Sequence, residues 1–329
     1  MAASASADIA AALWYCEAGK VEIRQEILAL PGAGEVRVTS LCSAVSRGTE
    51  SLVFAGRVPR SEFARMRAPF MAGEFPFPVK YGYATVGRVE DGSVALRGRN
   101  VFVLHPHQTA FNVPAASVVM LPDNVPPHRA LLAANMETAL NGVWDAVPGP
   151  ADDIAVVGAG VVGCLVAYLC GQLPGAKVTL VDINPARAEL ASALGVGFAE
   201  PAKAKRDCDV VVHASGSPDG LGTALDLAGD EATVLEMSWY GDRAVSALLG
   251  GPFHSRRLRL ISSQVGSIAA SHRPRWSHHR RLSAAVGLLA DPRLDALLAP
   301  AIAFGDLPKR LPEILAAGSG ILCQPIAYL

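Results

Sequence analysis

The segment Ile154-Ala-Val-Val-Gly158-Ala-Gly160-Val-Val-Gly163 decides the fold. Four apolar residues precede three glycines spaced G-x-G-x-x-G, and an apolar helical pattern then continues to about Leu173. Gly158 allows a tight turn, Gly160 lets a ligand approach the backbone, and Gly163 lets a helix pack closely on a strand. The first N–H groups of a helix and its dipole attract an anion. The segment therefore predicts a strand, a turn and a helix that hold a pyrophosphate; a tight turn without a ligand is the alternative.

The next apolar run, Val178-Thr-Leu-Val-Asp182, adds context to the glycine motif because it ends in an acid 19 residues after Gly163. A carboxylate at this point of a dinucleotide fold accepts the ribose hydroxyls and repels a 2′-phosphate. We therefore expect NAD(H) rather than NADP(H), with the backbone of Val161 and Val162 at the pyrophosphate. Arg187 either covers the adenosine side or is a solvated helix residue.

Strands and helices alternate after this motif, which predicts a parallel sheet covered on both faces. The expected strands are residues 154–157, 177–182, 210–214, 233–236 and 259–263, and the expected helices follow the first three of them. Ligands bind at the carboxyl ends of such strands. Small or polar residues there are predicted to contact the cofactor, although ordinary loop composition explains each equally well: Ser215, Ser238, Ser263 and Gln264.

Composition excludes several classes of protein. The 329 residues are 51% hydrophobic and 18% charged, with a formal net charge of −1, so the chain is neither disordered nor a general nucleic-acid binder. Mean hydropathy is +0.30, but the longest uncharged run, residues 154–176, is rich in glycine and predicts no membrane span. The six cysteines form no C-x-x-C pair, and the N-terminus does not match a secretory signal. These features predict a reduced, cytoplasmic protein.

The part before the glycine motif predicts short strands near residues 36–41, 84–89 and 100–104, then a helix over 127–147. With Gly34–Val38, Gly82–Val89 and Leu121–Val125, this order resembles the medium-chain dehydrogenase/reductase superfamily. The segments Val45–Glu50, Phe253–Leu258 and Ser262–Gly266 resemble a branch near bacteriochlorophyllide 3-hydroxyethyl dehydrogenases. The resemblance implies an α/β fold, with a Rossmann domain over 140–266, a discontinuous GroES-like catalytic domain over 1–139 and 267–329, and a homodimer.

The sequence departs from the zinc-dependent members of that superfamily. Ser46 stands where they have a catalytic cysteine, and Gly82-Tyr83-Ala84 stands where they have Gly-His-Glu. Their four-cysteine structural lobe is also missing, because no cysteine occurs between Cys42 and Cys164. We therefore expect NAD(H) without a catalytic zinc. The alternative is a relocated metal site in which Glu137 joins Glu50, His105 or His107.

Without a metal, hydride transfer needs a hydrogen-bond donor for the substrate oxygen. Tyr83 is the predicted acid/base and Ser46 the orienting hydroxyl, unless both only fill the space left by the metal. A phenol has a pKa of about 10, so we expect Lys80 or Arg47 to lower that of Tyr83. The resemblance places Thr138 near the nicotinamide, and Glu50 either bonds to cofactor or substrate or closes the turn after Ser46.

Residues 254–281 contain seven arginines, four histidines and no acid. We expect this segment to hold an anionic substrate, unless it forms a solvated face or a dimer contact. A polycyclic metabolite is also considered as the substrate. The predicted substrate contacts are Arg47, His107, Arg256 and Arg257. The leading function is an alcohol–carbonyl oxidoreductase; the alternatives are a zinc-free enoyl or quinone reductase and a non-catalytic NAD sensor or scaffold.

Overall fold

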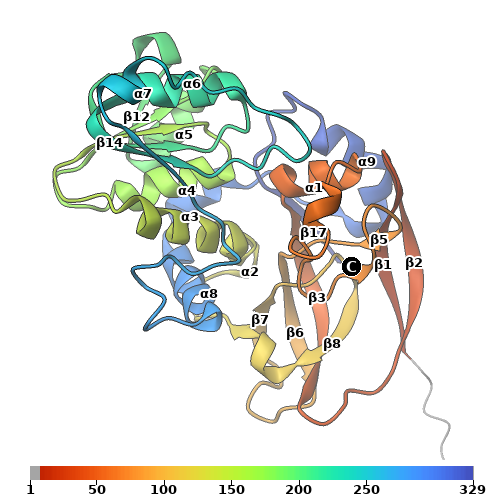
Figure 1. Ribbon diagram of the computed structural model, residues 1–329. Coiled ribbons are helices and arrows are strands. Elements are labelled where there is room, and N and C mark those ends of the chain that lie inside the picture. Colours follow the sequence, from red (N-terminus) through yellow and green to blue (C-terminus); the bar gives the residue numbers. More distant parts are fainter. Residues whose placement is uncertain (1–7, 329) are drawn as a thin grey trace, which may run out of the picture. The chain divides into compact units, whose positions relative to one another are not determined.

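The computed structural model describes residues 8–328 and divides them into two compact units (Figure 1). Asn135–Leu297 forms one unit, and the described residues before and after it form the other. We call them the Rossmann unit and the β-rich unit. The predicted boundaries at 140 and 266 differ from this division mainly in residues 267–297, which pack with the Rossmann unit.

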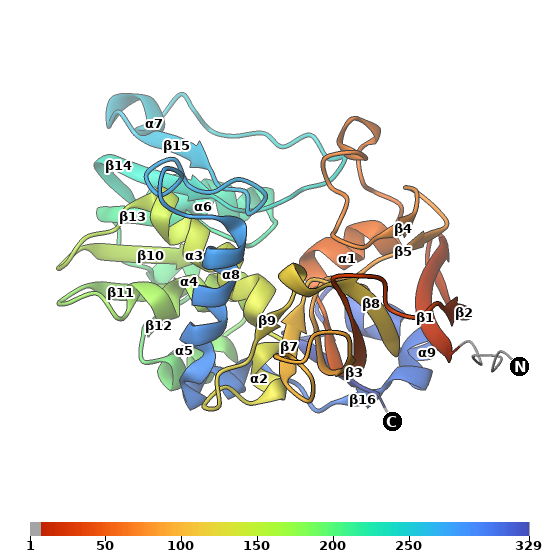
Figure 2. The same ribbon diagram turned by 90° about the horizontal axis from the view of Figure 1, so that it is seen from below.

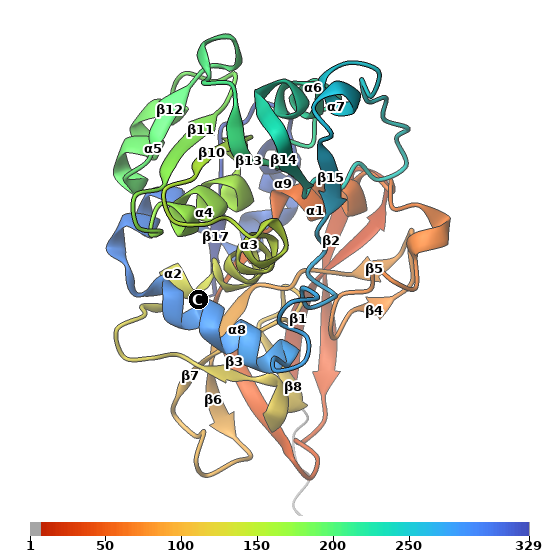
Figure 3. The same cartoon turned by 60° about the vertical axis from the view of Figure 1, so that its left-hand side comes forward.

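The Rossmann unit contains a parallel sheet, and its strands fan out in Figure 3. Within the described residues, the strand order is β12-β11-β10-β13-β14-β15. The strands are β10 (Asp153–Val157), β11 (Lys177–Val181), β12 (Gly197–Ala199), β13 (Cys208–His213), β14 (Ala228–Glu236) and β15 (Arg259–Ser262). Five of them match the predicted runs. Of these, β15 is a largely exposed edge strand, whereas the other four are apolar strands with mostly buried residues, a pattern that is conspicuous in sequence. The short strand β12 has no such pattern.

Helices cover both faces of this sheet. Helix α4 (Val161–Cys170) packs on β10 and β11, α5 (Arg187–Leu194) follows β11, and α6 (Pro218–Leu227) packs on β10, β13 and β14. Right-handed crossovers that leave β10 and β13 in opposite directions place α4 and α6 on opposite faces. Ala155 and Val157 therefore pack in one core with Leu221 and Ala224. The short helix α7 (Pro252–Ser255) precedes β15.

Two further helices, α3 (Ala133–Ala146) and α8 (His278–Gly287), lie side by side in Figures 2 and 3. The fully buried Arg281 joins them: its Nε is 3.0 Å from Glu137 Oε1 and it also donates to Asn141 and to the carbonyl of Val265. This contact explains why residues 267–297 stay with the Rossmann unit. The single helix predicted over 127–147 is broken, because α2 (Pro127–Ala130) ends before α3 begins.

The β-rich unit contains two sheets. Within the described residues, one has the order β2-β1-β5-β4 and the other β16-β17-β3-β6-β7-β9, with β8 also paired to β3. Their strands are β1 (Asp8–Glu17), β2 (Lys20–Leu28), β3 (Glu35–Val45), β4 (Ala72–Gly73), β5 (Val79–Lys80), β6 (Thr85–Asp91), β7 (Asn100–Val103), β8 (Ala110–Pro114), β9 (Val119–Met120), β16 (Ile302–Ala303) and β17 (Gln324–Ala327). Strand β17 returns from the C-terminal part to pair antiparallel with β3.

Helices α1 (Arg47–Phe54) and α9 (Leu307–Leu315) lie side by side in this unit (Figure 1). The guanidinium of Arg47 donates to the carbonyls of Ile314 at 2.7 Å, Ala316 at 2.9 Å and Ile321 at 2.5 Å. A cation at the C-terminal end of a helix is stabilised by the free carbonyls there. Arg47 therefore holds α1 to the end of α9.

The described part of the chain also contains short 3₁₀ helices: η1 (Arg60–Glu62), η2 (Ala115–Ser117), η3 (Pro201–Lys203), η4 (Leu288–Ala290), η5 (Pro292–Leu297) and η6 (Phe304–Asp306). None of the helices within residues 8–328 is both long and apolar enough to cross a bilayer.

Candidate functional site

The three glycines of the motif form a cradle at the start of α4, and we call Gly158, Gly160 and Gly163 the glycine cradle. Gly158 has φ +107°, and a Cβ there would lie 2.6 Å from the backbone of Ser215. A Cβ on Gly163 would lie 1.9 Å from the carbonyl oxygen of Gly158. A Cβ on Gly160 would meet nothing within 4 Å. Two glycines are therefore required by packing, whereas the third leaves the approach to the backbone open.

The cradle opens onto the N-terminus of α4. Gly160 is the N-cap and has no side chain to bond the first turn. The first N–H groups of an α-helix have no partner within the helix, so the backbone at Val161 and Val162 is available to an anion. These residues fit a dinucleotide pyrophosphate.

Asp182 lies beside the cradle at the end of β11. Its Oδ2 accepts the N–H of Ala159 at 2.7 Å and its Oδ1 accepts the N–H of Asn184 at 2.8 Å. The carboxylate is half-buried and held in place, and each oxygen retains a lone pair for a ribose hydroxyl. Arg187 is the half-buried first residue of α5.

The other predicted cofactor residues follow strands β13 to β15 but differ in their contacts. Ser215 Oγ is 2.6 Å from His213 Nε2, and Ser238 Oγ accepts the N–H of Gly216 at 3.0 Å. Ser263 donates to Asp145 at 2.7 Å, and Gln264 accepts the N–H of Gly266 at 2.6 Å. Ser263 and Gln264 are therefore engaged with α3 and with their own loop.

A pair of hydroxyls forms the second candidate group, in the β-rich unit. The Tyr83 hydroxyl donates to Ser46 Oγ at 2.6 Å, and we call these two residues the hydroxyl pair. Ser46 is the N-cap of α1, and its N–H donates to Glu50 Oε1 at 2.7 Å. The pair is thus fixed where β3 runs into α1.

Behind the hydroxyl pair lies a fully buried carboxylate, Glu50. Its Oε2 accepts the Tyr15 hydroxyl at 2.6 Å and contacts His107 Nε2 at 3.1 Å. His107 Nδ1 is 2.8 Å from Ser43 Oγ, which is 2.8 Å from the Tyr328 hydroxyl. We call Tyr15, Ser43, Glu50, His107 and Tyr328 the Glu50 cluster. Burial, followed by the charge of Glu50, raises the pKa of Tyr15 well above its usual value, so Tyr15 remains a donor.

His107 was expected to contact substrate, but its side chain is fully buried in the Glu50 cluster. The turn beside it requires glycine: Gly82 has φ +124°, and a Cβ there would lie 2.9 Å from the His107 ring. His107 therefore supports Glu50 instead of lining a surface. Sequence analysis missed Tyr15, Ser43 and Tyr328, although the glycine between Tyr81 and Tyr83 signals a close approach of another group.

The expected cation beside Tyr83 is not there. Lys80 Nζ bonds Glu26 at 2.7 Å and Gln108 at 2.8 Å, and Arg47 holds the end of α9. Burial raises the pKa of Tyr83 to about 12, although hydrogen bonds with Ser46 and Thr49 oppose the rise. The expectation of a lowered pKa is wrong, and Tyr83 is a protonated donor at neutral pH.

Ser46 and Tyr83 do not fit the ligand set of a catalytic zinc. Zinc prefers thiolate, imidazole and carboxylate ligands, whereas the two positions in question carry hydroxyls. Among residues 8–328, no three His, Cys, Asp or Glu side chains are grouped to hold a metal ion. Glu137, considered for a relocated site, is ion-paired with Arg281 at 3.0 Å. Thr138 is half-buried on α3.

Arg256 and Arg257 lie at the amino end of β14. Arg256 donates to the carbonyl of Ala228 at 2.9 Å and is 3.7 Å from Asp230, and Arg257 is 3.6 Å from Glu231. The glycine cradle lies at the opposite, carboxyl edge of this parallel sheet. The structure therefore separates these two arginines from the cofactor residues.

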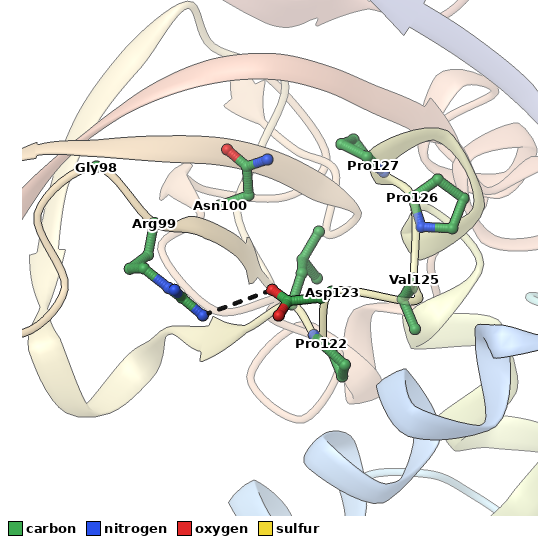
Figure 4. Close-up of a pocket in the computed structure, with 9 residues that line it drawn as sticks. Gly98, Arg99, Asn100, Pro122, Asp123, Val125, Pro126 and Pro127 are labelled. Carbon is green, nitrogen blue, oxygen red and sulfur yellow. Dashed lines mark ion pairs between the residues drawn. The ribbon is translucent and has the colours of Figure 1, made fainter.

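A pocket in the β-rich unit is a different feature (Figure 4). Its lining comprises Gly98–Asn100, Leu121–Asp123 and Val125–Pro127. Arg99 and Asp123, its charged residues, are 3.9 Å apart and largely exposed. None of the residues predicted for catalysis or binding lines this pocket, so it is not the candidate site.

Comparisons with known proteins agree with this architecture. No protein-family model matches the chain. It is 32% identical to L-threonine 3-dehydrogenase of Chelativorans sp. (strain BNC1) over 130 residues, which cover 38% of this chain and 36% of that protein. A dehydrogenase of Sinorhizobium meliloti 1021 bound to NADP matches 97% of this chain and 99% of its own, with a TM-score of 0.77 and 18% identity. For an alcohol dehydrogenase of Escherichia coli CFT073 complexed with NADH, the match also covers 97% of this chain and 99% of that one, with a TM-score of 0.76 and 16% identity.

The chain has the fold of the medium-chain dehydrogenases/reductases, a Rossmann sheet with a GroES-like β-rich unit. The predicted fold class is confirmed, and the resemblance to this superfamily is confirmed at the level of the fold; the narrower branch stays a prediction. The matched segment of the L-threonine 3-dehydrogenase spans only about a third of either chain.

Proposed function

We propose that the protein is an NAD(H)-dependent oxidoreductase that interconverts an alcohol and a ketone or aldehyde. The observation that carries the proposal is the glycine cradle at the N-terminus of α4, with the Asp182 carboxylate held beside it. The cradle and the first turn at Val161 and Val162 bind the pyrophosphate. Asp182 accepts a ribose hydroxyl and disfavours a 2′-phosphate.

Bound NAD(H) would supply or accept the hydride, and the hydroxyl pair donates or accepts the proton. During reduction the substrate oxygen gains negative charge, and Ser46 donates a hydrogen bond to it while Tyr83 turns its hydroxyl hydrogen from Ser46 Oγ to the same oxygen. The Tyr83 proton passes to this oxygen, and water reprotonates Tyr83 afterwards. In the oxidation direction Tyr83 first loses its proton to water and then accepts the proton of the alcohol. The Glu50 cluster holds the Ser46 N–H and so fixes the pair.

We propose that this chemistry needs no zinc, because hydroxyls occupy the two positions at which the resemblance would place metal ligands. An anionic substrate loses support, since Arg256 and Arg257 face Asp230 and Glu231 and Arg47 binds backbone carbonyls. A polycyclic substrate, a cytoplasmic location and a homodimer remain predictions.

The first test is titration of the purified protein with NADH and NADPH by calorimetry, with NADH expected to bind more tightly. Turnover is then followed with a panel of aldehydes and ketones, and with NAD⁺ plus alcohols that include L-threonine. Elemental analysis of the active protein decides whether zinc is present. Absence of NADH binding would refute the proposal.

Variants link turnover to the hydroxyl pair. Tyr83→Phe should lower kcat by about 100-fold while the Kd for NADH stays unchanged, because general acid catalysis contributes about 10²–10⁴. Tyr168→Phe, which removes a hydroxyl bonded to Asp291, is the matched control. NADH binding without turnover of any substrate would favour a sensor, and reduction of a conjugated C=C bond would favour an enoyl reductase.

A further inference from the structure

His213 and Glu236 end strands β13 and β14 and are not used by the proposed mechanism. They face each other in the strand register, with His213 Nδ1 2.7 Å from Glu236 Oε2. The His213 side chain is fully buried, whereas 16% of the Glu236 side chain is exposed. A carboxylate thus reaches the carboxyl edge of the sheet, where ligands of this fold bind.

Several donors hold Glu236 in its ionised form. Its Oε1 accepts the N–H of Ser238 at 2.6 Å, and its Oε2 accepts the Tyr240 hydroxyl at 3.1 Å. Burial raises the pKa of Glu236, but the hydrogen bonds from His213 and Ser238 outweigh it and keep the pKa below its usual value. The Glu236 carboxylate is therefore held in one position and is ionised at neutral pH.

The sheet order places this charge in a particular half of the dinucleotide fold. A doubly wound sheet binds one mononucleotide over each half. Asp182 marks the adenosine half, which contains β10, β11 and β12. The nicotinamide half contains β13, β14 and β15, with β14 in the middle. Glu236 thus ends the central strand of the nicotinamide half.

We propose that Glu236 is a specificity-determining residue that favours oxidised NAD⁺ over reduced NADH. The nicotinamide ring is positively charged in NAD⁺ and neutral in NADH, while the remainder of the two molecules is the same. A fixed carboxylate in this half of the site therefore stabilises only the oxidised ring. The inference rests on the proposed function, since it requires that the Rossmann unit binds NAD(H).

The test compares dissociation constants of NAD⁺ and NADH for wild type and variants by calorimetry. Glu236→Gln should raise the Kd of NAD⁺ by about fivefold to tenfold, the size expected for a unit charge acting across several ångströms of partly solvated protein, with little change for NADH. Glu236→Asp keeps the charge and should keep the wild-type ratio of the two constants. Glu231→Gln, at the exposed amino end of the same strand, is the control and should change neither constant.

A purely structural role of Glu236 predicts a different result, namely an equal loss of affinity for both cofactors in Glu236→Gln, and that result would overturn the inference. An unchanged Kd for NAD⁺ would overturn it as well. If Glu236→Gln does not fold, Glu236→Ser removes the same charge and leaves room for water, and the same ratio decides. Failure of the wild-type protein to bind either cofactor would instead overturn the proposed function, and this inference with it.

Discussion

Tyr83 is a weak acid because burial raises its pKa to about 12, so little of it is deprotonated at neutral pH. Alcohol oxidation requires Tyr83 to accept a proton, and below its pKa the deprotonated fraction rises tenfold with each pH unit. We therefore expect kcat/KM for oxidation to increase about tenfold per unit between roughly pH 7 and 10. A pH series of initial rates measures this slope. Tyr83→Phe should flatten it and Tyr168→Phe should not; a slope that survives in Tyr83→Phe would assign the proton to another group.

His105 gives the protein a defined sensitivity to acid. It is buried and stacked on Phe111, with ring centroids 3.6 Å apart, and burial lowers its pKa from 6.5 to about 3. Between these values the unfolded chain binds one more proton than the folded chain, so stability falls as the pH falls. The loss should reach about 2 kcal/mol at about pH 5.

Urea unfolding of wild type and His105→Gln between neutral pH and pH 5 measures this effect. Glutamine does not titrate, so the variant should lose about 2 kcal/mol less than wild type over that range, whatever its stability at neutral pH. Parallel pH dependences in the two proteins would show that His105 is not the group responsible.

The elements of the Rossmann unit could be predicted from the sequence better than those of the β-rich unit. Strands such as β10 and β11 are continuous apolar runs bounded by glycine or acid, and the same local pattern fixes the glycine cradle. Helix α1 was missed because its first residues, from Arg47 to Glu50, have the composition of a turn. The Glu50 cluster could not be predicted, because its side chains come from β1, β3, α1, the segment before β8 and the C-terminal end.

In the turn from β10 to α4, Gly163 is required for folding, whereas Gly160 is required only for binding. Gly160, the N-cap of α4, has φ of −76°, which alanine also adopts, and a Cβ there would meet no atom within 4 Å. Gly160→Ala should therefore fold with an unchanged Tm. Its methyl group would occupy the approach to the backbone, and the Kd for NADH should rise at least about tenfold, because the close backbone approach to the pyrophosphate is blocked.

Gly163→Ala is the contrasting variant in the same turn. Its Cβ would lie 1.9 Å from the Gly158 carbonyl oxygen, so the strand and helix must separate. We expect both a lower Tm and loss of NADH binding, measured by thermal unfolding and calorimetry. Equal behaviour of the two alanine variants would contradict the different roles assigned to Gly160 and Gly163.

At the scale of the whole molecule, each compact unit has a hydrophobic core of its own. Val36, Val38 and Phe111 belong to a core in the β-rich unit, and Val211 and Leu225 to one in the Rossmann unit. Ligands stabilise the part of a protein that binds them, by about 2.7 kcal/mol at a concentration of 100 Kd. NADH should therefore stabilise the Rossmann unit more than the β-rich unit.

The tryptophans allow the two units to be followed separately. Trp14 is in the β-rich unit, and Trp144, Trp239 and Trp276 are in the Rossmann unit. In Trp14→Phe, fluorescence reports only the Rossmann unit, whereas the variant with phenylalanine at the other three positions reports only the β-rich unit. Urea unfolding with NADH should move the midpoint of the first variant further than that of the second. Equal shifts in both would mean that the chain unfolds as one cooperative unit, because binding energy gained in one part would then stabilise the other to the same extent.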